Sequence, residues 1–498
     1  MTDREQPRTR RAARPERDGF AVWVRRHTVA VTATGLSLVF ALLATGAIVV
    51  GVAVGEERAS AAVALEQEVE PEAEPEPEPE AEPDPRPVPD ELVPPSPLRT
   101  CTIASQAADP RLGQFQAHVI DIATGDTLFD RNGDVAQPAA SNMKVLTAAA
   151  ALAALGPDYR LTTRVVAGDE PGTVVLIGGG DVTLSALPPG EESFYPGAPK
   201  LADLAAQTVA AYAAANPDEP AITRVLLDTS YFLDEDRWDS SWNRSLQTIG
   251  YASEVTALQV DADRANPRAQ ESPRSTDPVG RAGQAFAQAL AGAGNPGGAP
   301  AFERGAAGGG GQLAAVRSQP MAQLMERMVL DSDNSLADSI GRVISRHYGL
   351  GGTAASLTPA FVQALRVYGI PTDGIVVRDA SGLSNLNQIP PVYLAHLFTV
   401  IERSPELQVI TRSLPVAGQS GTLRTRFGGA NSSAAGHVTA KTGWIDNVFT
   451  LSGLMTASDG SRIAFSLYAL GPVNFSAREA LDTVTTAIHG CGDNLANI

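Results

Sequence analysis

Two of the lysines in this chain of 498 residues occur in patterns that can do chemistry. Only three of the 38 basic residues are lysines, and the rest are arginines. Lys144 follows Ser141 by three positions in "AASNMKVLTAAAAL", and Lys441 lies in "AKTGW". The third, Lys200 in "YPGAPKLAD", is predicted to face solvent. A composition that otherwise uses arginine for its cations suggests that Lys144 and Lys441 have a property that arginine lacks.

Ser141 and Lys144 lie on the same face of a predicted helix, one turn apart. A serine hydroxyl is a poor nucleophile until a neighbouring group takes its proton. A lysine can accept that proton if its surroundings lower its pKa, whereas arginine does not deprotonate in proteins. The S-x-x-K pattern is common by chance, but here it uses one of only three lysines.

Ser332 and Asn334 form an S-x-N pattern in "DSDNSLAD". Such a loop can place a hydroxyl to pass a proton to a leaving amine and an amide to hold a peptide bond. Taken alone, the segment is better explained as a helix cap, because it is rich in capping residues.

The "AKTGW" segment is predicted to be a strand edge. Lys441 would supply a permanent cation beside a substrate carboxylate, with Thr442 next to it, and Gly443 would let a substrate backbone approach. The alternative for Lys441 is an exposed strand lysine. The order S-x-x-K, S-x-N, K-[ST]-G is the set found in penicillin-binding proteins and β-lactamases, and it indicates an active-site serine acyltransferase. No G-x-S-x-G or H-E-x-x-H motif offers another centre.

The elements around these motifs predict an α+β fold. Residues 115–134 read as a hairpin, 141–155 as a helix, and 438–470 as a strand meander followed by a terminal helix. These strands can share one antiparallel sheet flanked by helices, including those predicted within 318–348 and 389–403. The expected divisions are a main domain in two parts, 99–159 and 271–498, interrupted by a smaller inserted domain, 160–270.

The N-terminal residues predict attachment to a membrane. A basic tail, 1–28, precedes an uncharged run, 29–54, long enough to cross a bilayer as one transmembrane helix with the N-terminus in the cytoplasm. A cleaved signal peptide or a buried soluble helix is the alternative. Residues 55–98 form a Glu/Pro-rich linker, expected to be extended. With a net charge of −18 and no basic cluster beyond the N-terminal tail, a nucleic-acid partner is not expected.

The two cysteines, Cys101 and Cys491, bracket the part of the chain expected to fold. An oxidising compartment could join them as a disulfide, since domain termini often lie close together. The alternative is two unrelated thiols. No partner cysteine or spaced histidine favours a metal site.

The sequence around the motifs resembles the class C low-molecular-mass penicillin-binding proteins, which are D-alanyl-D-alanine carboxypeptidases and endopeptidases of the bacterial cell wall. The resemblance is carried by "AASNMKVLTAAAAL", "LDSDNSLAD", "RDASGLSNLNQIPP", "SGTLRTRF" and "AKTGWIDNV", with "GGGDVTLS" and "YASEVTALQVDADR" similar to the family's inserted domain. It covers roughly residues 105–490. It implies a serine β-lactamase/transpeptidase-like domain.

By this resemblance, Ser141 attacks the D-Ala-D-Ala carbonyl and Lys144 is its base. The backbone N–H groups of Ser141 and Trp444 would form the oxyanion hole. Ser332 would relay the proton to the leaving D-alanine. The substrate would be held by side chains of the other two motifs: Asn334, Lys441 and Thr442.

The expected substrate is a peptidoglycan stem peptide ending in D-Ala-D-Ala, and β-lactams would acylate Ser141. No metal or cofactor is expected. A β-lactamase on the same residues, and a catalytically idle wall-binding protein, are the alternatives. Side-chain selection by the enzyme is open, because Asn385 stands where relatives often carry an arginine, and "WNRSLQTIGYASEV" lacks the aspartate expected as its partner.

Overall fold

The computed structural model describes residues 98–497, which form one compact unit with its own hydrophobic cores. The expected tail, anchor and linker lie outside the described residues, apart from Leu98. Within 98–497 no helix is both long and apolar enough to cross a membrane.

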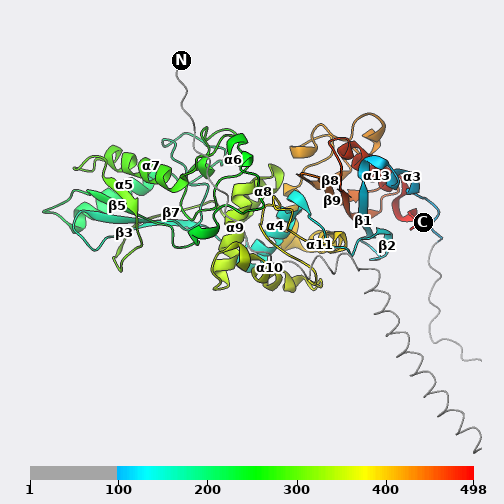
Figure 1. Cartoon of the computed structure of the whole chain (residues 1–498), viewed down its shortest axis with the longest axis horizontal. Coiled ribbons are helices and arrows are strands. Elements are labelled where there is room, and N and C mark those ends of the chain that lie inside the picture. Colours follow the sequence, from blue (N-terminus) through cyan, green and yellow to red (C-terminus); the bar gives the residue numbers. More distant parts are fainter. Residues whose placement is uncertain (1–97, 498) are drawn as a thin grey trace, which may run out of the picture. The chain divides into compact units, whose positions relative to one another are not determined.

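A five-stranded antiparallel sheet carries the two ends of the described chain (Figure 1). Its order is β2 (Thr127–Arg131), β1 (Gln114–Asp121), β10 (Arg462–Leu470), β9 (Val448–Thr456) and β8 (Val438–Ile445). The predicted hairpin and meander are therefore confirmed, and β1 joins them by pairing with β10 along its whole length. β8 is an outer strand of this sheet, and the first part of its outer edge pairs with residues 415–417.

Helices cover both faces of this sheet. α13 (Ala477–Cys491) and the short α3 (Ala104–Ala107) share one hydrophobic core with it, and α11 (Pro391–Arg403) packs against β1 and β10. β10 is buried at every position after its first residue, as expected for a strand with both faces covered.

A helical layer forms the second core and continues from α11. It consists of α4 (Met143–Leu155), α8 (Met321–Leu330), α9 (Asn334–His347), α10 (Leu357–Leu365) and α12 (Gln408–Ser413). α4 is made of strong helix formers and ends at Gly156, whose φ of 82° stops the helix. Every residue of α4 from Met143 to Leu152 is buried, so it is a central helix of the core.

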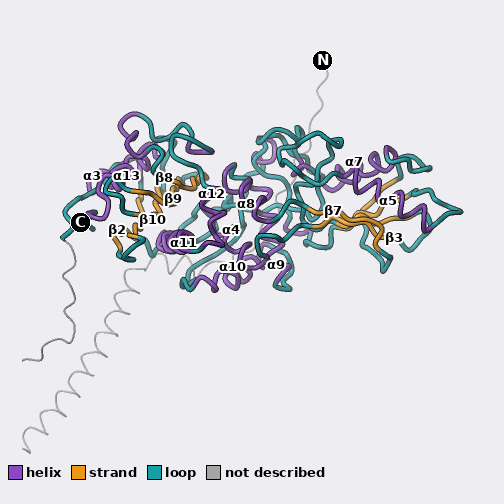
Figure 2. Tube along the Cα trace, turned by 180° about the vertical axis from the view of Figure 1, so that it is seen from behind, coloured by secondary structure: helices purple, strands orange, loops and turns teal. Residues whose placement is uncertain are grey.

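A second five-stranded sheet interrupts the main fold after α4, and it lies on the far side of the helical layer in both views (Figures 1 and 2). Its order is β6 (Ala301–Arg304), β5 (Arg224–Asp228), β4 (Thr173–Ile177), β3 (Thr162–Ala167) and β7 (Gln312–Arg317), with α5 (Leu201–Ala215) and α7 (Pro278–Gly292) packed on it.

The sequence-based boundary of the insertion at residue 270 does not agree with this sheet. β7 pairs with β3 from Thr162↔Arg317 onward, so the sheet closes only at Arg317. The short strands β6 and β7 were not predicted, because they lie in and directly after a glycine- and proline-rich stretch and neither has a strand pattern of its own. Residues 162–317 are called the inserted region below.

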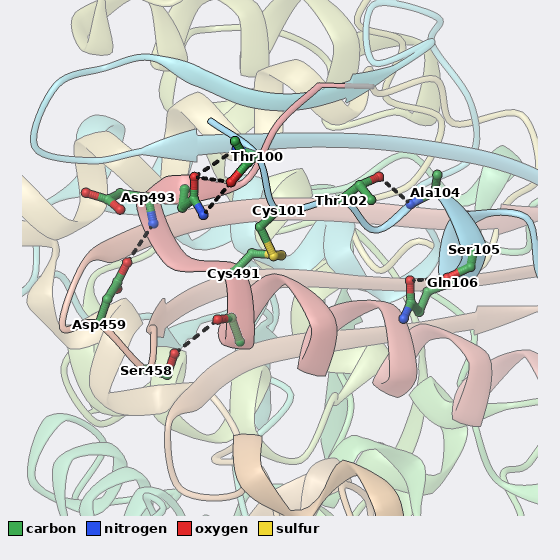
Figure 3. The surroundings of a disulfide bond; sticks show 12 residues. Thr100, Cys101, Thr102, Ala104, Ser105, Gln106, Ser458, Asp459, Cys491 and Asp493 are labelled. Atoms are coloured by element: carbon green, nitrogen blue, oxygen red, sulfur yellow. Dashed lines mark hydrogen bonds between the residues drawn. A yellow bond between two sulfur atoms is a disulfide. The ribbon is translucent and has the colours of Figure 1, made fainter. Parts of the chain in front are cut away.

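The predicted disulfide joins Cys101 to Cys491, with the Cα atoms 5.5 Å apart (Figure 3). The N-terminal strand-like segment is also tied to the C-terminus by hydrogen bonds, since the amide of Thr100 donates to Asn494 Oδ1 at 2.8 Å. The two ends of the described chain are therefore held side by side.

Candidate active site

Ser141 lies in a 3₁₀ turn, η2 (Ala140–Asn142), that leads directly into α4. The turn is held against the first sheet: Asn142 donates to Ser452 Oγ at 2.7 Å, and Thr450 donates to the carbonyl of Ala139 at 2.9 Å. Ala140 has a φ of 46°, in the left-handed region. These contacts fix the position of the Ser141 hydroxyl relative to β9.

Lys144 is fully buried on α4 and uses all three of its donors. Its Nζ lies 3.2 Å from Ser141 Oγ, 2.6 Å from Asn334 Oδ1 and 2.6 Å from the carbonyl oxygen of Ser381. If Lys144 loses a proton, Ser141 can donate its own hydrogen along the same contact. The geometry therefore fits proton transfer between Ser141 and Lys144.

Burial lowers the pKa of Lys144 from the usual 10.5 to about 8, although the nearby carboxylates of Asp338, Asp379 and Asp333 act in the opposite direction. Burial disfavours the charged ammonium because the protein interior solvates it less well than water does. About a tenth of Lys144 is therefore neutral at pH 7.

Two buried carboxyl groups behind Lys144 were not found from the sequence. Asp338 accepts hydrogen bonds from the amides of Ala380 and Ser381, both at 3.0 Å, which orients the Ser381 carbonyl toward Lys144. Burial, and then the charge of Asp379, raise the pKa of Asp338 well above its usual value. The segment "RDASGLSNLN" was quoted above for its resemblance to a known family, but its local sequence does not show which residues it packs against.

Ser332 sits between α8 and α9 with a φ of 59°, a left-handed conformation that is unusual for serine. Asp333 caps α9 by accepting from the amide of Leu336, so the capping interpretation of this segment also holds. Asp333 is buried and forms an ion pair with Arg264 at 2.8 Å. Burial raises the pKa of Asp333, but the Arg264 charge and hydrogen bonds outweigh it and lower the pKa to about 2.

Asn334 connects the helical layer with the inserted region. Its Oδ1 accepts from Lys144, while its Nδ2 donates to the carbonyl oxygen of Tyr251 at 3.0 Å. This hydrogen bond to the Tyr251 carbonyl was not predicted, because it depends on how the inserted region packs against the helical layer.

Lys441 on β8 is fully buried, so it is not the exposed strand lysine of the alternative interpretation. Its Nζ donates to Ser332 Oγ at 2.9 Å and to the carbonyl of Thr442 at 3.0 Å. Burial, and then the charge of Lys144, lower the pKa of Lys441 well below its usual 10.5. A bound substrate carboxylate would favour the charged form of Lys441, which the sequence analysis expects to be a permanent cation.

Thr442 and Gly443 follow on the same strand. The hydroxyl of Thr442 lies 2.7 Å from that of Thr422, a residue that the sequence analysis did not single out. A Cβ on Gly443 would lie 2.1 Å from Thr450 Oγ1 and 2.9 Å from the Ala139 carbonyl. The close approach of β8 to Thr450 on β9 and to the chain before Ser141 therefore requires a glycine here, and the expected approach of a substrate backbone at Gly443 stays a prediction.

The third lysine is also not solvent-facing, contrary to the prediction. Lys200 is only 9% exposed and its amine donates to the carbonyl of Glu191. It immediately precedes α5, where the fold of the inserted region covers it.

The three motifs meet at one cleft of about 860 Å³. Its lining includes residues of all three motifs, of the loop before α11, and of the inserted region: Ser141, Ser332, Asn334, Asn385, Thr442, Gly443, Trp444, Leu246, Tyr251 and Arg274. Trp444 is 40% exposed and contacts Phe449 and Phe475, with the Arg478 guanidinium over these rings. All eight predicted catalytic and substrate-binding positions are therefore within one connected site.

Comparison with known proteins agrees with this arrangement. A profile of the D-Ala-D-Ala carboxypeptidase 3 (S13) family matches residues 100–274 and 267–490. Carboxypeptidase DacB of Mycolicibacterium smegmatis is 34% identical over 415 residues, covering 81% of this chain and 87% of that protein. The D-alanyl-D-alanine carboxypeptidase of an Actinomadura species is 28% identical over 451 residues, covering 73% and 79%.

Similarity to a solved structure supports the fold. Penicillin binding protein 4 from Haemophilus influenzae matches with a TM-score of 0.60 at 20% identity, over 75% of this chain and 94% of that one. The ordered motifs, their convergence in one cleft and the match along most of the described residues agree: this chain belongs to the D-Ala-D-Ala carboxypeptidase 3 (S13) family.

Proposed function

We propose that the chain is a serine-type D-Ala-D-Ala carboxypeptidase that trims peptidoglycan stem peptides through an acyl-enzyme on Ser141. The observation that carries this proposal is the position of Lys144. Its amine is fully buried, it lies 3.2 Å from the serine hydroxyl, and its pKa is lowered to about 8. An amine in this state can serve as a general base, which a lysine in water cannot do efficiently at neutral pH.

In the acylation step, Lys144 takes the proton of Ser141 while Oγ attacks the carbonyl carbon of the penultimate D-alanine. The backbone N–H groups of Ser141 and Trp444, which both line the cleft, are assigned to the developing oxyanion. The C–N bond then breaks, and the proton that Lys144 took up is passed through Ser332 to the leaving amine. Water next attacks the ester carbonyl, the bond from Ser141 Oγ to the acyl carbon breaks, and a proton from that water returns to Ser141.

Substrate binding is assigned to the groups around this centre. The terminal carboxylate would contact Lys441 and the paired hydroxyls of Thr442 and Thr422, which lie 2.7 Å apart. Asn334 would hold the substrate amide, since its side chain is fixed between Lys144 and the Tyr251 carbonyl. β-Lactams would enter as substrate mimics and acylate the same serine.

The test is covalent labelling of the full-length protein in detergent by a fluorescent penicillin. Labelling should occur in the wild type and be absent in Ser141→Ala. A folded wild type that takes no label would contradict the assignment. Release of D-alanine from a stem pentapeptide, compared with β-lactam turnover, separates a carboxypeptidase from a β-lactamase. An idle wall-binding protein would do neither.

Endopeptidase activity is part of the proposal, because the cleft extends beyond the motifs to the inserted region and leaves space for a larger leaving group. Incubation with purified cross-linked muropeptide dimers should yield monomers. Dimers that remain intact while pentapeptides are trimmed would restrict the enzyme to carboxypeptidase activity.

The location proposed for the enzyme is the outer side of the cell membrane, anchored through residues 29–54. This is supported by the uncharged run of these residues between an arginine-rich and a glutamate-rich flank, and by the Cys101–Cys491 disulfide, which needs an oxidising compartment. Protease added to intact spheroplasts should remove the catalytic part and leave a short membrane-protected N-terminal fragment. Recovery of the full chain in the soluble fraction would contradict this.

A further inference from the structure

Arg274 is a buried arginine whose side chain has no partner within residues 98–497. It lines the cleft from the inserted region and is only 8% exposed. Its Nε and Nη1 are buried without a hydrogen bond, and it forms no ion pair among the described residues. Its backbone is fixed, since it bridges Arg264 and its amide donates to the Gln247 carbonyl at 3.0 Å.

The other two buried arginines of the described chain are both paired. Arg264 contacts Asp333 and the hydroxyl of Tyr195, both at 2.8 Å, and Arg342 contacts Asp236 at 2.9 Å. A buried charge is costly unless a counter-charge and hydrogen bonds compensate it. Arg274 is therefore the one described arginine buried without compensation.

The two carboxylates whose charges act on Arg274 are already paired with other arginines, Asp333 with Arg264 and Asp263 with Arg281. Glu271, which lines the same cleft, interacts with Tyr251 and forms no ion pair with Arg274. Burial, and then the positive charge of Arg264, lower the pKa of Arg274 to about 10, so it stays charged at neutral pH. This side of the cleft therefore presents a positive charge without a counter-charge to a molecule bound in the cleft.

The segment that carries Arg274 packs on the motif that carries Ser332. Gln270 donates to the Asp331 carbonyl at 2.9 Å, and Arg264 holds Asp333, so both neighbours of Ser332 contact residues 264–270. The terminal carboxylate of the substrate is already assigned to Lys441 and Thr442. A further cation in the same cleft suits a second carboxylate.

We propose that Arg274 is a specificity residue that binds a second carboxylate of the peptidoglycan substrate, separate from its C-terminal carboxylate. This deepens the function proposed above and rests on it. The second carboxylate belongs either to the stem that acylates Ser141 or to a cross-linked leaving strand. Amidation of that carboxylate removes the charge that Arg274 recognises, so the enzyme distinguishes free-acid from amidated peptidoglycan.

The deciding experiment measures equilibrium binding to full-length Ser141→Ala, which removes turnover from the measurement. One pair of probes is a stem pentapeptide with a free or an amidated carboxylate before the scissile bond. The second pair is a cross-linked dimer with a free or an amidated carboxylate on the leaving strand. One pair should show about 10- to 100-fold tighter binding of the free acid, and that pair identifies the source.

The preference should disappear in Ser141→Ala/Arg274→Met and survive in part in Ser141→Ala/Arg274→Lys. Arg268→Met is the matched control on the same segment. Arg268 pairs with Glu191 and is outside the cleft lining, so its loss should leave the preference intact. Equal binding of acid and amide in both pairs, or a preference that survives Arg274→Met, overturns the proposal.

Penicillin labelling of Arg274→Met with Ser141 intact reports whether the variant folds, because penicillin has no second carboxylate to lose. If Arg274→Met does not fold, Arg274→Gln, which removes the charge and keeps hydrogen-bonding capacity, replaces it in the binding test. Failure of the carboxypeptidase function would appear separately, as absence of D-alanine release from the wild type with both acid and amide peptides.

Discussion

The pKa of Lys144 predicts how acylation depends on pH. With a pKa of about 8, about one amine in ten is neutral at pH 7. With the usual lysine value of 10.5, the neutral fraction would be roughly 300-fold smaller, which corresponds to about 3 kcal/mol. Burial of Lys144 on α4 is thus expected to supply a factor of this size to the acylation rate.

The measurement is the second-order rate constant for acylation by a fluorescent penicillin between pH 5.5 and 10. The rate should rise about tenfold per pH unit below 8 and level off above it, since only the neutral amine accepts the proton of Ser141. The rate should fall where Lys441 loses the proton that pairs it with the penicillin carboxylate, and the lowered pKa of Lys441 brings this fall into the pH range measured.

Two arginine variants separate the rise of the acylation rate with pH from its later fall. Lys144→Arg should lower the rate by about 10⁴-fold or more, because a guanidinium does not deprotonate in this range. Lys441→Arg should lose some activity through the shape of its side chain, but it should lack the alkaline fall. Thermal melting should show that both variants fold.

A wild-type rate that does not change between pH 6 and 9 would refute the assignment of Lys144 as base. So would a folded Lys144→Arg that retains more than about one per cent of the rate. An alkaline fall that persists in Lys441→Arg would refute the role given to Lys441.

Three further predictions concern the scaffold. Reduction of the Cys101–Cys491 disulfide, which spans 390 residues, should cost at most about 5 kcal/mol and lower the melting temperature; two alkylatable thiols in the unreduced protein would contradict the pairing. Gly443→Ala should slow acylation at least tenfold and destabilise by about 1–3 kcal/mol, because the new Cβ meets Thr450 Oγ1; a Gly443→Ala/Thr450→Ser variant should not recover, as the hydroxyl remains. Asp333 has a pKa lowered from 3.8 to about 2, so its stabilisation is complete above about pH 5 and is lost as pH falls toward 2. Acid titration of unfolding should show about 2 kcal/mol lost over this range, and less in Asp333→Asn.

Much of the site could be predicted from the sequence because its parts are short and local. Ser141 and Lys144 are held at contact distance by helix geometry alone, and the capping residues around Ser332 mark a helix start. The hairpin and the meander each form from neighbouring strands, so their patterns also predicted the first sheet.

Tertiary structure decided what depends on distant segments. The burial of Lys441 and Lys200, the carboxyl group of Asp338 behind Lys144, and the end of the insertion at Arg317 all arise from packing between residues far apart in the chain. A side chain's pKa and pairing depend on what surrounds it in space, and residue type does not specify that. The sequence by itself therefore determined which groups can react, and only the fold decided which of them are buried, paired or, like Arg274, left without a partner.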